Sequence, residues 1–242
     1  MKHEERIAIG TEYANNLLKR LGDELVLFGI GGSTYRNEDR EDSDLDVIIV
    51  TEHEGYGGAP NWHHEHVKDL LIEMKYFHKA EIEKMLKTPG WNWPQNFFRL
   101  TNFMPVYQKY DFKKWCKELV DSVEDKKFID AAMEDINIAN SSMGKVREHY
   151  RKKNLSFLRS AALLTVSYLD LALALVNRGV LYPGFGARDV ALLISQYKKL
   201  PEGYVPNALK LWESCDIAEI YNAAEALVES TTQFVERMQK SI

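Results

Sequence analysis

The sequence predicts an α+β protein in which a small mixed sheet with helices precedes an all-helical bundle. Two observations support this prediction. Short apolar runs of strand length, bounded by glycine or polar residues, lie in the N-terminal part of the chain. After residue 121 the apolar residues recur at helical spacing, without strand-like runs. We therefore expect a first domain with a mixed sheet over residues 1–122 and a helical domain over residues 123–242.

The N-terminal elements follow from the order of apolar runs and glycines. Apolar residues at helical spacing predict a first helix, which Gly22 ends. A short apolar run then leads into a glycine turn that opens a second, short helix. Two more apolar runs predict strands, and the polar segment between them predicts a loop. The expected ranges are Glu4–Leu21 for the helix, Leu25–Ile30, Asp46–Thr51 and Leu70–Phe77 for the strands, and 52–66 for the loop.

The C-terminal half predicts five helices by its hydrophobic periodicity. A Pro/Gly break at Leu200–Tyr204 interrupts this half. The expected helices cover residues 128–150, 157–177, 187–198, 208–212 and 217–238.

The composition is that of an ordinary soluble globular protein. The 242 residues are 45% hydrophobic and 28% charged, and the formal net charge is −5. This length is enough for two domains with their own hydrophobic cores. An acidic balance argues against binding nucleic acid through bulk charge, and it fits a cationic or small-molecule partner at least as well.

The cysteines and the apolar stretches indicate the cellular context. Cys116 and Cys215, the only cysteines, provide neither a disulfide framework nor a cysteine metal site, which suits a reducing cytoplasm. The first ten residues carry acidic side chains where an export signal has basic ones. The most apolar stretch, residues 161–176, contains Asp170 and is shorter than the roughly 20 residues of a membrane span. We therefore expect a cytoplasmic protein without a membrane segment.

The residues that point to chemistry follow the first predicted strand. Gly31–Ser33 form a glycine turn, and Asp44 and Asp46 flank the start of the next apolar run. A dinucleotide-binding fingerprint is excluded because Thr34 stands where that motif has its third glycine. A P-loop is excluded because no Gly-Lys-Ser/Thr is present.

Two of these acids are spaced for metal binding. On a strand, Asp44 and Asp46 point to the same face, with Cα atoms about 6.6 Å apart. Carboxylates at this spacing can share Mg²⁺ ions that are bridged by phosphate oxygens. Glu73, the one acid among apolar residues of a later strand, is the candidate third ligand.

The glycine turn is suited to a phosphate. Gly31 and Gly32 let the backbone approach an anion, Ser33 offers its hydroxyl and amide, and Arg36 adds charge-assisted contacts. Taken singly, each feature also has a structural explanation, such as a solvated turn or an exposed strand glutamate. Their occurrence together, in this order, favours the functional interpretation.

The combined pattern resembles the nucleotidyltransferase (polymerase β-like) superfamily, in which Gly-Ser is followed about ten residues later by Asp-x-Asp and then by a third acid. Over most of the chain it resembles more narrowly the kanamycin nucleotidyltransferase, or aminoglycoside 4′-O-nucleotidyltransferase, type. Further similar stretches are Glu4-Glu5-Arg6, Gly32-Ser33-x-x-Arg36, Ile72-Glu73, Phe97-Phe98, Met143-Gly144-Lys145 and Leu200–Tyr204.

This resemblance implies roles for individual residues. By position, Asp44, Asp46 and Glu73 are similar to the catalytic, Mg²⁺-binding acids, Ser33 to a phosphate ligand, and Lys145 to a lysine that contacts the nucleotide phosphates. The resemblance also implies ATP or another nucleoside triphosphate as co-substrate, an antibiotic-resistance activity, and a homodimer with its active sites at the subunit interface.

One position departs from the pattern. The family places a glutamate general base four residues before the phosphate-binding lysine, and this chain has Ser141 there. A serine does not hold a proton taken from a hydroxyl at neutral pH. The departure weakens the inference of 4′-O-transfer but not that of nucleotide and metal binding.

The sequence therefore supports two hypotheses. The first is a Mg²⁺-dependent nucleotidyltransferase that moves a nucleoside monophosphate to a hydroxyl of a small-molecule acceptor, for example an aminoglycoside-like compound. The second is a catalytically weakened nucleotidyltransferase fold that acts as a binding or antitoxin-type regulatory protein. The four residues Ser33, Asp44, Asp46 and Glu73 favour the first, and Ser141 favours the second.

Two weaker signals remain. His63, His64 and His66 have spacing that suggests zinc, but no cysteine accompanies them and a solvated loop explains them better. Asp170, alone in an apolar helix, must be paired, protonated or directed at a cavity, and we consider that it reaches the acceptor pocket.

Overall fold

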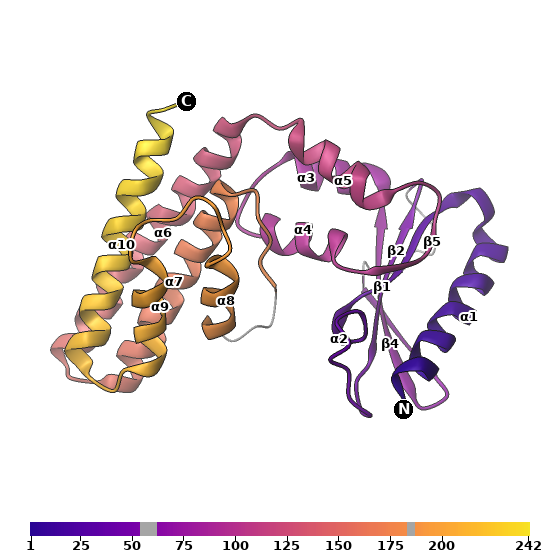
Figure 1. The fold of residues 1–242 in the computed structure, drawn as a ribbon, viewed down its shortest axis with the longest axis horizontal. Helices are drawn as coiled ribbons and strands as arrows, with labels where there is room; N and C mark the ends of the chain where they lie inside the picture. Colours follow the sequence, from indigo (N-terminus) through magenta and orange to yellow (C-terminus); the bar gives the residue numbers. More distant parts are fainter. Residues whose placement is uncertain (54–61, 183–186) are drawn as a thin grey trace. The chain divides into compact units, whose positions relative to one another are not determined.

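The computed structural model describes residues 1–53, 62–182 and 187–242, and its contacts divide the chain into two compact units. The first unit consists of Met1–Lys87 and Arg99–Ser122. The second consists of Thr88–Phe98 and Val123–Ile242. A mixed sheet with helices lies in the N-terminal part and helices alone follow, which confirms the α+β class predicted from the sequence (Figure 1). The proposed domain ranges themselves stay a prediction.

The sheet of the first unit has five strands among the described residues, in the order β3-β4-β2-β1-β5. Strands β2 and β4 are parallel, and every other neighbouring pair is antiparallel. Two parallel strands need a crossover connection between them. The chain between β2 and β4 includes β3, which pairs with the other side of β4 and forms an edge of the sheet. The strands are β1 Leu25–Ile30, β2 Leu45–Thr51, β3 Trp62–Val67, β4 Leu70–His78 and β5 Met104–Gln108.

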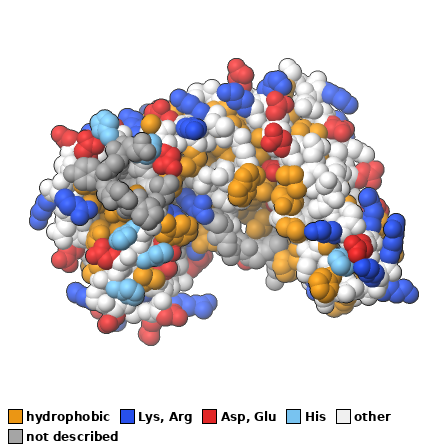
Figure 2. All heavy atoms as spheres, turned by 180° about the vertical axis from the view of Figure 1, so that it is seen from behind, with side chains coloured by type: hydrophobic (Ala, Val, Ile, Leu, Met, Phe, Trp, Pro, Cys, Tyr) orange, Lys and Arg blue, Asp and Glu red, His pale blue; other side chains and the backbone are white. Residues whose placement is uncertain are grey.

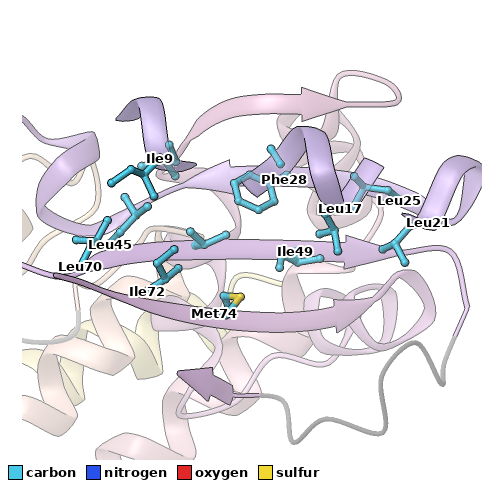
Figure 3. Packing of buried hydrophobic residues seen from close by; sticks show 13 residues of the cluster. Ile9, Leu17, Leu21, Leu25, Phe28, Leu45, Ile49, Leu70, Ile72 and Met74 are labelled. Atoms are coloured by element: carbon cyan, nitrogen blue, oxygen red, sulfur yellow. The ribbon is translucent and has the colours of Figure 1, made fainter. Parts of the chain in front are cut away.

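One face of this sheet packs against helix α1, which spans His3–Leu21. Alternate side chains of β2 and β4 enter this core, as Figure 3 shows for Leu45, Ile49, Ile72 and Met74. Successive side chains of a strand point to opposite faces, so Asp46 and Glu73 project from the face away from α1. The hydrophobic pattern thereby determines on which side of the sheet the acids lie.

The sequence analysis did not predict the strand β5 or three helices of this region. These helices are α3 Lys79–Lys87, α4 Trp93–Thr101 and α5 Phe112–Asp121. The expected loop over 52–66 is wrong for residues 62–66, which belong to β3. The side chains of β3 are almost all exposed, because it is an edge strand, so they lack the apolar alternation that predicts a strand. The other expected loop residues, 54–61, lie outside the described residues.

The second unit contains the five helices that periodicity predicts, with different ends. Helices α6, α7 and α10 run side by side (Figure 1). Periodicity locates the apolar centre of each helix, whereas end residues depend on caps such as Asn154 and Asp216. The helices are α6 Asp125–Arg151, α7 Leu155–Val176, α8 Ala187–Ile194, α9 Tyr204–Glu213 and α10 Ile217–Gln239.

Helix α7 explains the lone acid in the apolar stretch. By length and composition α7 could cross a membrane. However, 61% of its apolar 18-residue stretch is buried in the structure, as in the core helix of a soluble protein. Asp170 is 5% exposed, and the Tyr204 hydroxyl donates a hydrogen bond to Asp170 Oδ1 at 2.6 Å. Burial raises the pKa of Asp170 to about 7. The expectation that Asp170 reaches an acceptor pocket is therefore replaced by a structural role beside Tyr204.

We predict that Asp170→Asn changes the pH dependence of stability. Between about pH 4 and pH 7 the unfolded chain has lost the Asp170 proton and the folded chain still holds it, so the wild type loses up to about 4 kcal/mol as the pH rises. The asparagine variant lacks this loss. Urea unfolding of both proteins at pH 5, 6, 7 and 8 should show the variant gaining relative to the wild type up to about pH 7, with little further gain at pH 8. A stability difference that is constant with pH would contradict this account.

Candidate active site

Two acids of the candidate site are placed by backbone pairing. Asp46 on β2 is the register partner of Glu73 on β4, so both side chains project from adjacent positions on one face. Asp44 precedes β2, which begins at Leu45. Its position therefore depends on the segment that enters the strand, and not on the sheet.

The acids influence one another electrostatically. The pKa of Asp46 is raised to about 6, first by burial and then by the negative charges of Asp44 and Glu73. Lys75 and Arg36 oppose this effect. A half-buried carboxylate beside two others is a group that a cation would stabilise. The structure thus brings the three predicted acids into one electrostatic cluster.

The glycine turn lies directly beside Asp46. The Gly31 N–H donates a hydrogen bond to the Asp46 carbonyl oxygen at 2.9 Å. Gly32 has φ +60°, and a Cβ atom built on it would lie 1.7 Å from Asp46 Oδ2. Only glycine fits this contact, because both the backbone conformation and the space exclude a side chain. The same residues open the short helix α2, Gly32–Tyr35, in which Ser33 is partly exposed.

Cationic side chains surround the acids. Arg36 lies just after α2, and its Nε donates to Glu38 Oε2 at 2.7 Å. Lys75 Nζ is 3.5 Å from Glu73 Oε1. Burial lowers the pKa of Lys75, and the nearby charge of Arg99 lowers it further. Burial also lowers the pKa of Arg99, whereas Asp46 and Glu73 raise it. The site therefore combines three acids with three cations.

The edge strand β3 adds residues that sequence reasoning did not place in the site. His64 Nε2 is 3.5 Å from Glu73 Oε2, and Lys75 Nζ lies 3.9 Å from the centre of the Trp62 ring. Figure 2 shows several exposed histidine side chains on the first unit, which contains β3. Lys75 shares the face of Glu73 two residues along the strand, so alternation could have found it. Nothing in the local pattern indicates Arg99, Trp62 or His64.

Two residues that the resemblance singles out lie in the second unit. Ser141 and Lys145 are one turn apart on α6, and both are exposed. Their roles toward a nucleotide or an acceptor therefore stay predictions, separate from the cluster of acids in the first unit.

The metal assignment also stays a prediction. Within residues 1–53, 62–182 and 187–242, no three His, Cys, Asp or Glu side chains are grouped closely enough to hold a metal ion as they stand. The donor set nevertheless fits Mg²⁺ chemically, because carboxylate oxygens are the protein ligands that this ion prefers. The raised pKa of Asp46 is the observation that supports this fit.

We predict that Gly32→Ala is more destabilising than Gly22→Ala. Gly22 has a similar φ of +54°, but no heavy atom lies within 4 Å of the place that a Cβ would take, so its substitution adds a side chain at positive φ without a steric clash. The added methyl at position 32 must also displace the Asp46 carboxylate. We expect this displacement to lower the free energy of unfolding by a further amount of about 1–3 kcal/mol, the range for overpacking. Urea unfolding of the two variants measures the difference. Equal losses would show that Asp46 moves away freely.

Comparison with known proteins bears on the family and the fold of the chain. No family model matches the chain. A curated protein from Bacillus sp, an aminoglycoside nucleotidyltransferase (4′), is 24% identical over 131 residues, which are 54% of this chain and 51% of that protein. The chain thus spans about half the length of this relative.

A solved structure gives the second likeness. It is described as a nucleotidyltransferase-like protein from Exiguobacterium sibiricum 255-15, and the match covers 99% of this chain and 80% of that chain. The TM-score is 0.51 and the sequence identity is 12%. Together with the sequence match, it shows that the chain has a nucleotidyltransferase-like fold and supports its place in the nucleotidyltransferase superfamily.

Proposed function

We propose that the chain is a Mg²⁺-dependent nucleotidyltransferase that moves a nucleoside monophosphate from ATP or another nucleoside triphosphate to a hydroxyl of a small-molecule acceptor. One observation carries the proposal. Asp46 and Glu73 are register partners on the face of the sheet away from α1, and Asp46 packs against the Gly31–Gly32 turn. This combination has no structural purpose of its own, because it crowds like charges at a half-buried position.

In this proposal Asp44, Asp46 and Glu73 hold the metal. Lys75 and Arg36 relieve part of their mutual repulsion, and a divalent cation bound between the acids relieves it further. When bound, Mg²⁺ supplies positive charge that activates the acceptor hydroxyl and neutralises the pyrophosphate leaving group.

The chain's own residues bind and orient the triphosphate. The backbone at Gly32 and the hydroxyl of Ser33 contact phosphate oxygens, and Arg36 adds a charge-assisted hydrogen bond. Lys75 and Arg99, which lie beside the acids, neutralise further phosphate charge. The resemblance adds Lys145 of the second unit as another phosphate contact. These groups position the α-phosphorus for in-line attack.

The acceptor is proposed to be a cationic hydroxyl compound, such as an aminoglycoside-like molecule. A cavity of about 550 Å³ lies beside Asp44 in the first unit, and acidic side chains dominate its polar lining. Carboxylates at a cavity wall attract ammonium groups. The curated Bacillus relative is named as an aminoglycoside nucleotidyltransferase, which supports the same class of acceptor. A role in antibiotic resistance is proposed on the resemblance alone. The acids of the cavity are Glu38, Glu41, Asp42, Asp44 and Asp69.

Ser141 supports the second candidate function. Its exposed hydroxyl stands where the family has a general base, so a catalytically weakened binding or antitoxin-type protein remains the alternative. For either function we propose a homodimer, on the resemblance alone, and a cytoplasmic location, on the cysteine usage of the sequence.

We predict that Asp46→Asn, and likewise Asp44→Asn, lowers nucleotidyl transfer at least about 100-fold, since a metal ion supplies several kcal/mol of transition-state stabilisation. Pyrophosphate release from ATP and GTP, with Mg²⁺ and a panel of aminoglycosides and other polyols, measures this loss. Asp121→Asn is the matched control, because it removes the same charge from an exposed position of the first unit. Near-normal turnover in either site variant would refute the metal assignment.

We also predict that the unaltered protein transfers slowly, or not at all, to kanamycin-type 4′-hydroxyls and that Ser141→Glu accelerates this transfer. A general base contributes roughly 10²–10⁴-fold to such a step. Ser141→Gln is the control, since it adds a similar volume without a proton acceptor. Efficient kanamycin modification by the unaltered protein, with no response to Ser141→Glu, would show that the base lies elsewhere.

A further inference from the structure

A buried arginine connects helix α1 to the segment that precedes β2. The Arg6 side chain is 1% exposed, and its Nη1 pairs with Asp39 Oδ2, whose side chain is 2% exposed. His3 Nδ1 is 2.7 Å from the other oxygen, Asp39 Oδ1. Burial alone would raise the pKa of Asp39, but the His3 hydrogen bond and the charges of His3 and Arg6 outweigh it, so this pKa lies below its usual value. Asp39 therefore stays ionised as the anchor of the segment.

The same guanidinium also binds the backbone of this segment. Arg6 Nη2 donates to the Arg40 carbonyl oxygen at 2.8 Å and, at 3.5 Å, to that of Glu41. The fork of one arginine thus holds a carboxylate and two carbonyls at consecutive residues.

These contacts extend to Ser43, the residue before Asp44. The carbonyl oxygen of Arg40 accepts the Arg6 bond and also a bond from the Ser43 N–H at 3.1 Å. The Arg40 N–H in turn donates to Ser43 Oγ at 2.9 Å. The Arg6 guanidinium and the Ser43 N–H therefore donate to the same atom, the Arg40 carbonyl oxygen.

Asp44 needs such support because the sheet does not provide it. Asp46 is held by strand pairing and by the Gly31 N–H, whereas Asp44 lies outside β2. A buried ion pair is weak evidence for added stability, since apolar residues of similar volume often replace one without loss. A role in fixing the segment explains its presence better.

We propose that Arg6 and Asp39 are positioning residues that fix the Arg40–Ser43 turn and thereby hold Asp44 at the divalent-cation site. The proposal rests on the proposed function, in which Asp44 is a metal ligand. Arg6 and Asp39 touch neither nucleotide nor metal in this account. They act through the backbone between residues 39 and 44.

The test compares the wild type, Arg6→Lys and the double variant Arg6→Met/Asp39→Leu, which replaces both charges together so that neither is left buried alone. Arg178→Met is the matched control, because Arg178 also donates to a carboxylate and a carbonyl, those of Asp125 and Val123, within the second unit. The readouts are amide hydrogen exchange over residues 42–46, binding of Mn²⁺ alone by electron paramagnetic resonance, and kcat and KM for transfer.

We expect at least about tenfold faster exchange over residues 42–46 and at least tenfold weaker Mn²⁺ binding in the double variant, with kcat lowered more than KM for the nucleotide is raised. Arg6→Lys should show faster exchange too, because one ammonium cannot replace the fork. Arg178→Met should leave exchange and Mn²⁺ binding unchanged. Unchanged exchange and Mn²⁺ affinity in a folded double variant would overturn the positioning role.

The exchange readout separates this proposal from the proposed function. A wild type that neither binds Mn²⁺ nor transfers nucleotides would refute the proposed function. Even then, faster amide exchange in the Arg6 variants would support the inference that Arg6 fixes the segment before Asp44. Unchanged exchange would refute that inference too.

Discussion

The parallel pairing of β2 with β4 is the constraint on which the rest of the candidate site depends. It sets Asp46 opposite Glu73, and the apolar alternation of both strands commits these acids to the face away from α1. A shift of β4 against β2 by one residue would send Glu73 into the core beneath α1, while Asp46 would stay where the pairing of β2 with β1 holds it. The burial of apolar residues such as Leu45 and Ile72 therefore stabilises the fold and also fixes the strand register that positions the acids.

Around this pairing the first unit has two kinds of support. The backbone of the sheet and the glycine turn hold Asp46, while side-chain contacts from α1 hold the segment that ends at Asp44. The two acids therefore depend on different parts of the fold, although only one residue separates them. A helix that packs on the opposite face thus has two tasks, covering the core and bracing the loop.

Sequence patterns predicted several of the elements that bury apolar residues, although the helices α3 and α5, which also bury them, were missed. The strands β1, β2 and β4 and the helix α1 were expected nearly to the residue, because their alternation or periodicity comes from burial. The edge strand β3 was missed, since it buries little and is defined by hydrogen bonds to β4. Within the site, Glu73 could be identified as an acid among apolar neighbours. Arg99 and the Arg6–Asp39 pair could not, because only the folded chain brings residues so distant in sequence together.

The contact between Gly32 and Asp46 has a consequence for substitutions at either position. Gly32 is confined to glycine by the carboxylate of Asp46 and by its own backbone angle. Replacing Asp46 with alanine would remove the contacts with its carboxylate, but the Cβ atom of residue 46 would still lie 2.9 Å from a Cβ at position 32, and the positive φ would still favour glycine. A side chain at position 32 therefore requires the backbone of the glycine turn to move away from β2, whatever residue occupies position 46.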